Sequence, residues 1–347
     1  MTTPPEKTPD EETGQEPAAP EEIHLEAEPE TPVKAEEKTK SKAKPSLFGK
    51  LAIAAADIKI AHSVFALPFA ILAAFLAGPG RTGPGEPTKW VSFSVKLVLI
   101  VLCMVFARTW AMLINRMADR RHDAKNPRTA ERAFADERLS TLDGLVMLAG
   151  SGGLFVATCA MFTLLYDNQW PLYGSLPVLA WIAFYSFTKR FTLLCHVFLG
   201  GALAISPIAA AVAVDPSSLK IISVWLISAM VLCWVAGFDI IYALQDVEYD
   251  KGAGLHSVPS RLGPKRAINL SRVLHLLCMA ALLLAWWLNP NLGSVFGIGV
   301  ASTAVLLVAE HLVLVKRGKA GLGKAFFTLN GVLSLVLGIT GIIDVLS

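Results

Sequence analysis

The chain has 347 residues, of which 54% are hydrophobic and only 17% are charged. A soluble domain of this size carries roughly a quarter charged residues, so the composition argues against a soluble protein and favours one embedded in a lipid bilayer. The formal net charge is only +3, because residues 1–46 hold 12 acidic and 6 basic residues and leave 25 basic and 16 acidic residues in the rest.

Residues 1–46 are rich in Pro, Glu, Thr, Ala and Lys and contain almost no large apolar side chains. Such a segment buries too little surface to offset its ordering entropy, so we expect a disordered tail over 1–46 and a membrane domain over 47–347. No secretory signal precedes the first apolar run, and the tail is too acidic for a mitochondrial transit peptide. These features favour a bacterial plasma (inner) membrane.

From Leu51 onward, apolar runs alternate with short polar segments. Runs of about 20 apolar residues are long enough to cross the hydrocarbon core. They should be helices, because a helix satisfies its backbone polar groups within itself. The fold class is therefore all-α, a polytopic membrane protein with nine predicted spans. These cover residues 51–77, 91–114, 141–165, 173–188, 193–214, 221–243, 268–288, 293–315 and 325–346.

The Lys and Arg residues between the spans predict the orientation of the chain. They are concentrated before the first span and in the loops after the second, fourth, sixth and eighth, whereas the alternate loops hold few. Cytoplasmic loops carry an excess of positive charge, so the N-terminus is predicted to be cytoplasmic and the C-terminus external. That arrangement requires an odd number of spans.

A first acidic motif follows the second predicted span, where the sequence reads Asn115-Arg-Met-Ala-Asp119-Arg-Arg-His-Asp123. Its polar residues recur at every fourth position. On a helix they therefore project from one face. The orientation predicted from Lys and Arg alone places this face at the cytoplasmic end of the span, so the position of the aspartates is an independent indication of a cytoplasmic site.

A second acidic motif follows the sixth predicted span, where Asp239 comes directly after an apolar run. Asp246 and Asp250 follow it at steps of seven and four residues, which places all three on one helix face with Tyr242 beside them. Ionisable residues on one face at the end of a span indicate a functional site. This motif is also predicted to lie at the cytoplasmic end.

Several carboxylates that face one cavity repel one another and require a cation. Oxygen ligands without a set of Cys or His residues suit Mg²⁺, which prefers one or two carboxylates together with substrate phosphates. The two motifs therefore predict a magnesium ion that bridges a diphosphate. Nearby Arg and Lys residues could neutralise the remaining phosphate charge.

The paired motifs resemble those of the UbiA superfamily of intramembrane aromatic prenyltransferases. Asn115, Asp119 and Asp123 match its N-x-x-x-D-x-x-x-D motif, Asp246 and Asp250 match its D-x-x-x-D motif, and Asp239 matches an acidic position preceding the second motif in many members. Further similar stretches are residues 57–68, 126–132, 186–192 and 254–263, so the resemblance covers about residues 50–346.

The resemblance implies nine helices around a central cavity, Mg²⁺ as cofactor, and transfer of a polyprenyl chain from polyprenyl diphosphate to a small aromatic acid. The expected partners are these two substrates and the lipid bilayer, with no nucleic acid. The expected metal ligands are Asp119, Asp123, Asp246 and Asp250; the catalytic candidates are Asn115, Asp239 and Tyr242; the substrate-binding candidates are Arg128, Lys189 and Arg190.

Among UbiA members the sequence is most similar to the 4-hydroxybenzoate polyprenyltransferases of respiratory quinone biosynthesis. The stretch His256-Ser257-Val258-Pro259 departs from their Lys-Ser-Thr-Ala type, which leaves a hydroxynaphthoate of menaquinone biosynthesis as the alternative acceptor. Haem O synthase and chlorophyll synthase are further alternative functions within the superfamily.

Two other classes of membrane protein are alternatives to a prenyltransferase. A secondary transporter keeps buried charges as well, but usually near the midplane at interrupted helices, whereas these aspartates are predicted at helix ends. A CDP-alcohol transferase requires a D-G-x-x-A-R core that is not found in the sequence.

The histidines and cysteines of the spans are predicted to have ordinary interior roles. The histidines are isolated in apolar runs, so each is expected to be hydrogen-bonded rather than a metal ligand. The cysteines form no C-x-x-C pair and are expected to pack as small apolar residues. These residues are His62, His196, His275 and His311, with Cys103, Cys159, Cys195, Cys233 and Cys278.

Overall fold

The structure of the protein is a computed structural model, which describes residues 1–2, 46–58, 65–78, 90–318 and 322–347. Within these residues every regular element is a helix, as the sequence predicts. The predicted tail falls almost entirely outside the described residues, so its boundary stays a prediction.

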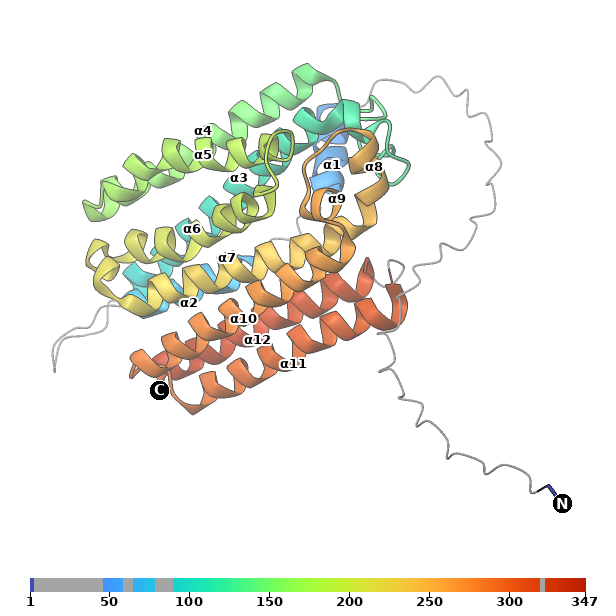
Figure 1. The fold of residues 1–347 in the computed structure, drawn as a ribbon. Coiled ribbons are helices and arrows are strands. Elements are labelled where there is room, and N and C mark those ends of the chain that lie inside the picture. Colours follow the sequence, from blue (N-terminus) through green and yellow to red (C-terminus); the bar gives the residue numbers. More distant parts are fainter. Residues whose placement is uncertain (3–45, 59–64, 79–89, 319–321) are drawn as a thin grey trace. The chain divides into compact units, whose positions relative to one another are not determined.

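The helices follow one another along the chain, and most of them are long (Figure 1). The α-helices are α1 (Leu47–Ile58), α2 (Leu67–Ala77), α3 (Trp90–Asp123), α4 (Thr141–Tyr166), α5 (Trp170–Thr188), α6 (Cys195–Val214), α7 (Ile222–Tyr242), α8 (Val247–Gly252), α9 (Val258–Leu262), α10 (Pro264–Leu288), α11 (Ser294–Arg317) and α12 (Lys324–Leu346). The described 3₁₀ helices are η2 (Pro216–Lys220) and η3 (Ala243–Asp246).

In the described parts of the chain, seven helices are long and apolar enough to cross a membrane, which confirms a multi-pass architecture. They are α3, α4, α6, α7 with its continuation to Gly252, α10, α11 and α12. The predicted span 51–77 falls on α1 and α2, and residues 59–64 between them lie outside the described residues. The predicted span 173–188 falls on α5, in which Trp, Tyr and Pro side chains dilute the apolar ones. The number nine therefore remains a prediction.

One local expectation was wrong. The spacing of the second motif predicts a single helix face, but α7 ends at Tyr242 and a 3₁₀ turn, η3, separates it from α8. A 3₁₀ turn has three residues per turn rather than 3.6, so it changes the direction of the side chains that follow it. The first motif is continuous, because α3 runs unbroken to Asp123.

Helix α7 packs between α6 and α10 and is the most buried of the long helices (Figure 1). Its side chains Ile227, Met230 and Trp234 are fully buried. Large apolar side chains on other helices, such as Leu164 on α4 and Leu276 on α10, are exposed. Exposed apolar surface of this kind is what a lipid-facing helix presents.

The contact between α6 and α7 depends on a small residue. A Cβ atom at Gly200 would lie 2.5 Å from the carbonyl oxygen of Leu232, a backbone atom that cannot rotate away. Small residues at such positions let membrane helices approach closely.

We therefore expect Gly200→Ala to destabilise the protein by about 1–3 kcal/mol, because the two helices must separate to admit the methyl group. Thermal unfolding in detergent would measure the loss. Gly153→Ala on α4 is the matched control, since a Cβ atom there meets nothing within 4 Å. Equal melting temperatures for the two variants would contradict this account of the interface.

Candidate active site

A single large cavity brings the predicted site residues together. Its volume is about 1410 Å³, and side chains from α1 and from α3 to α8 contribute to its wall. All ten predicted residues line it: Asn115, Asp119, Asp123, Arg128, Lys189, Arg190, Asp239, Tyr242, Asp246 and Asp250. The two acidic motifs, which are more than 100 residues apart in the sequence, therefore face one space.

The cavity has a polar end, where the aspartates lie, and a mainly apolar wall over the rest of its length. Both Asp123 and Ile100 on α3 line it, and 23 residues of helix extend about 34 Å. Beyond the aspartates the wall consists mainly of apolar and small side chains, including Phe162, Leu203 and Ala213. A ligand with a charged head and a long apolar tail matches this distribution.

The aspartates of the first motif are each paired with a basic side chain from another part of the chain. Arg190 Nη2, at the end of α5, lies 3.0 Å from Asp119 Oδ1. Arg132 Nη1, in the loop after α3, lies 2.7 Å from Asp123 Oδ1. Asn115 Nδ2 is 3.4 Å from Asp119 Oδ2, one helical turn away.

The aspartates of the second motif are paired in the same way. Arg128 donates two hydrogen bonds to Asp246, from Nε to Oδ1 at 2.9 Å and from Nη2 to Oδ2 at 2.5 Å, and Asn126 Nδ2 donates a third at 3.1 Å. Lys189 Nζ lies 2.8 Å from Oδ1 of the fully buried Asp250. Two-point Arg–carboxylate pairs are among the stronger charge-assisted contacts.

The ion pairs with Asp250 and Asp246 keep the side chains of Lys189 and Arg128 charged. Burial disfavours the charged form of Lys189, but the nearby carboxylates, chiefly Asp250, outweigh burial and raise the pKa of Lys189 above its usual value. Burial opposes the charge of Arg128 as well, and the hydrogen-bonded Asp246 raises the pKa of Arg128 in the same way. Both side chains are therefore cations in the cavity at neutral pH.

The donor atoms of the cavity fit a hard divalent cation. They are carboxylate oxygens, and Asp123 Oδ2 is buried without a hydrogen-bond partner. Across the described residues, however, no group of three or more His, Cys, Asp and Glu side chains converges closely enough to hold a metal ion. The carboxylates fit a cation that takes its remaining ligands from water and phosphate, as Mg²⁺ does.

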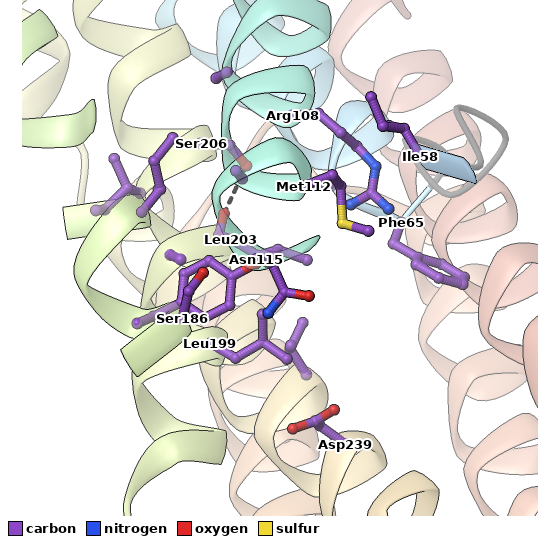
Figure 2. Close-up of a pocket in the computed structure, with 18 of the residues that line it drawn as sticks. Ile58, Phe65, Arg108, Met112, Asn115, Ser186, Leu199, Leu203, Ser206 and Asp239 are labelled. Atoms are coloured by element: carbon purple, nitrogen blue, oxygen red, sulfur yellow. Dashed lines mark hydrogen bonds between the residues drawn. The ribbon is translucent and has the colours of Figure 1, made fainter. Parts of the chain in front are cut away.

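The three catalytic candidates line the same cavity, and Figure 2 shows two of them, Asn115 and Asp239. Asn115 projects from α3 and Asp239 from α7, and Asp239 Oδ2 lies 2.7 Å from His196 Nδ1. Tyr242 accepts a hydrogen bond from Arg128 Nη1 at 3.4 Å. All three can thus meet a ligand that enters the cavity.

The interior histidines are hydrogen-bonded, as predicted. Besides the contact of His196 with Asp239, His275 Nδ1 lies 3.1 Å from His311 Nε2. His62 lies outside the described residues.

Arg108 is a cavity residue that the sequence analysis missed. Its side chain points into the cavity from α3, beside Met112 and about two turns before Asn115 (Figure 2). It forms no ion pair with any described residue, and its buried Nε lacks a hydrogen-bond partner. Its position inside the predicted span 91–114 was a usable signal, because a charge within a membrane helix indicates function.

Comparison with known proteins agrees with this arrangement. The chain is 34% identical over 268 residues to 4-hydroxybenzoate octaprenyltransferase of Edwardsiella ictaluri, a match that covers 75% of this chain and 85% of the relative. It is 28% identical over 261 residues to the enzyme of the same name from Methylococcus capsulatus, covering 74% and 82%.

Solved structures share the fold. A UbiA homolog from Aeropyrum pernix K1 superposes with a TM-score of 0.69 at 28% identity, covering 82% of this chain and 98% of that one. A UbiA homolog from Archaeoglobus fulgidus bound to GPP and Mg²⁺ gives a TM-score of 0.64 at 17% identity, covering 85% and 100%. Residues 66–332 match the UbiA prenyltransferase family as a whole. The chain is therefore a multi-pass membrane protein that belongs to the UbiA prenyltransferase family.

Proposed function

We propose that the protein transfers a polyprenyl chain from polyprenyl diphosphate to 4-hydroxybenzoate in respiratory quinone biosynthesis. The observation that carries this proposal is one cavity that joins four ion-paired aspartates to a long apolar wall. The names of the curated relatives support the acceptor. The enzyme would lie in a bacterial inner membrane with its N-terminus and its aspartates on the cytoplasmic side.

The aspartates Asp119, Asp123, Asp246 and Asp250 would hold Mg²⁺ through their carboxylate oxygens. When bound, the cation would neutralise the charge that develops on the departing diphosphate. The Archaeoglobus fulgidus homolog bound to GPP and Mg²⁺, and its form bound to Cd²⁺, support a divalent cation.

The basic partners of these aspartates would take part in binding the diphosphate. Arg128, Lys189 and Arg190 carry fixed positive charge at the polar end of the cavity. A diphosphate can accept hydrogen bonds from them while a divalent cation replaces them at the carboxylates, so the cation offsets most of the negative charge that the diphosphate adds. The apolar wall would hold the prenyl chain.

The acceptor acid would bind deeper, with its carboxylate on Arg108. A guanidinium without an ion pair in a largely buried site is costly, and a planar carboxylate provides two matching acceptors. The C–O bond of the prenyl diphosphate breaks, the allylic carbon bonds to the ring carbon ortho to the phenol oxygen, and that carbon loses its proton. Asp239 would orient the phenol or accept the proton, and Asn115 would help to orient the phenol.

The proposal is tested with membranes that contain the protein, Mg²⁺ and labelled polyprenyl diphosphate. Prenylated 4-hydroxybenzoate is the expected lipid product. A product formed only with a hydroxynaphthoate would assign the enzyme to menaquinone biosynthesis instead. No product with either acid would contradict the proposed reaction.

Removal of divalent cations should stop this reaction. We expect EDTA to abolish turnover and excess Mg²⁺ to restore it, because four carboxylates and a diphosphate cannot share the cavity without a cation. Product formation in the presence and absence of EDTA would be measured by extraction of the labelled lipid. Undiminished turnover in EDTA would show that the basic side chains alone balance the charge.

A further inference from the structure

We propose that His196 is a positioning residue that fixes the carboxylate of Asp239 at the acceptor end of the cavity. The proposal rests on the proposed function, in which Asp239 orients the acceptor or accepts its proton. His196 lies in the first turn of α6, and Asp239 lies near the end of α7. The two are 43 residues apart in the sequence and in direct contact.

Two contacts determine the state of the imidazole. Its Nε2 atom is 3.2 Å from the backbone nitrogen of Val258. A backbone N–H can only donate, so Nε2 accepts and carries no proton. The remaining proton is therefore on Nδ1, which lies 2.7 Å from Asp239 Oδ2 and donates to it. The imidazole of His196 is thus held from both sides, with its proton on Nδ1 directed at Asp239.

Burial separates the roles of the two residues. The side chain of His196 is only 2% exposed, whereas that of Asp239 is 26% exposed and faces the cavity. A substrate can therefore reach the carboxylate but has little access to the imidazole. His196 acts through Asp239, because it holds Oδ2 of that carboxylate, while Oδ1 accepts no hydrogen bond from a described residue and can meet the ligand.

The same contact links the acceptor end to the diphosphate end. Val258 follows Ser257, whose hydroxyl donates to Asp250 Oδ2 at 2.7 Å. A short hydrogen-bonded path thus runs from Asp250 through the start of α9 to His196 and Asp239. The links are the hydroxyl of Ser257, the backbone N–H of Val258 and the imidazole of His196, so the two ends of the cavity share one hydrogen-bonded support.

Kinetic analysis would test the positioning role. We expect His196→Ala to lower kcat by about 10- to 100-fold, as loss of an orienting partner does elsewhere. The KM for polyprenyl diphosphate should change less than about twofold. His196→Asn should recover much of kcat, since its amide nitrogen can donate from nearly the position of Nδ1. His275→Asn, a buried histidine outside the cavity, is the matched control and should keep kcat.

A spectroscopic measurement tests the contact independently of activity. In ¹⁵N-histidine-labelled protein in lipid discs, the resonances of His196, assigned by their loss in His196→Asn, should show a protonated Nδ1 and a bare Nε2. Asp239→Ala should remove this preference. A protonated Nε2 in the wild-type protein would overturn the proposal.

The two tests distinguish the failure of this inference from the failure of the proposed function. If the wild-type enzyme makes product and folded His196→Ala keeps its kcat, the positioning role is wrong and the proposed reaction stands. If the wild-type enzyme makes no product, the proposed reaction is wrong, and the state of Nδ1 and Nε2 still decides whether His196 holds Asp239.

Discussion

Replacement of Asp119 or Asp246 by asparagine is expected to lower kcat for prenyl transfer by about 10²- to 10³-fold, or roughly 3–4 kcal/mol of barrier. Each substitution removes one carboxylate charge from the polar end of the cavity while keeping the size of the side chain. It also leaves a basic partner, Arg190 or Arg128, without its counter-charge. Initial rates with purified protein and saturating substrates would measure the effect.

The dependence of these rates on Mg²⁺ adds a second readout. The concentration of Mg²⁺ that gives half-maximal turnover should rise in both variants, because each has lost one candidate ligand. Asp136→Asn is the matched control: Asp136 is also paired with an arginine, Arg138, but it does not line the cavity. Full turnover in both Asp119→Asn and Asp246→Asn would rule out the proposed role of the two motifs.

Replacement of Arg108 by methionine is expected to raise the KM for the aromatic acid by about 10- to 100-fold. Methionine retains an unbranched apolar stem but removes the guanidinium, and a hydrogen bond to a charged group contributes about 1.5–3 kcal/mol. The KM for polyprenyl diphosphate should stay unchanged, because Arg108 lies about three turns before Asp119 on α3. Steady-state kinetics with each substrate varied in turn would separate the two constants.

Two further variants sharpen the test of Arg108. Arg108→Lys keeps the charge but not the two-point geometry, so it should bind the acid with intermediate affinity. Arg121→Met, at an exposed position on the same helix and outside the cavity, should behave as the wild type. An Arg108→Met enzyme with an unchanged KM for the acid would show that the carboxylate binds elsewhere.

Much of the helical framework could be predicted from local patterns. The predicted spans 141–165 and 268–288 lie within α4 and α10, because apolar runs and their polar ends are properties of contiguous residues. The turn at η3 was not predictable in this way. Spacing alone assumes an unbroken helix, and the 3₁₀ segment between Asp239 and Asp250 departs from it.

The candidate site also has features that the sequence predicts and features that it does not. The sequence by itself determined that two acidic motifs occur at the ends of apolar helices, since apolar runs and the charges that follow them are properties of contiguous residues. Only the tertiary structure decided which basic side chain pairs with which carboxylate. Arg190 reaches Asp119 across 71 positions, and Arg128 reaches Asp246 across 118.

The proposed roles of Arg108 and His196 also depend on the tertiary structure. In the sequence each is a single polar residue within or beside an apolar run. Whether such a residue is paired, buried or directed into a cavity depends on what neighbouring helices place opposite it. Hydropathy and helical periodicity act along one segment, whereas ion pairs and tautomers are fixed by contacts between segments distant in the chain. The sequence therefore determined the long helices and the acidic face of the first motif, and the packing of the helices decided which side chains meet in the cavity.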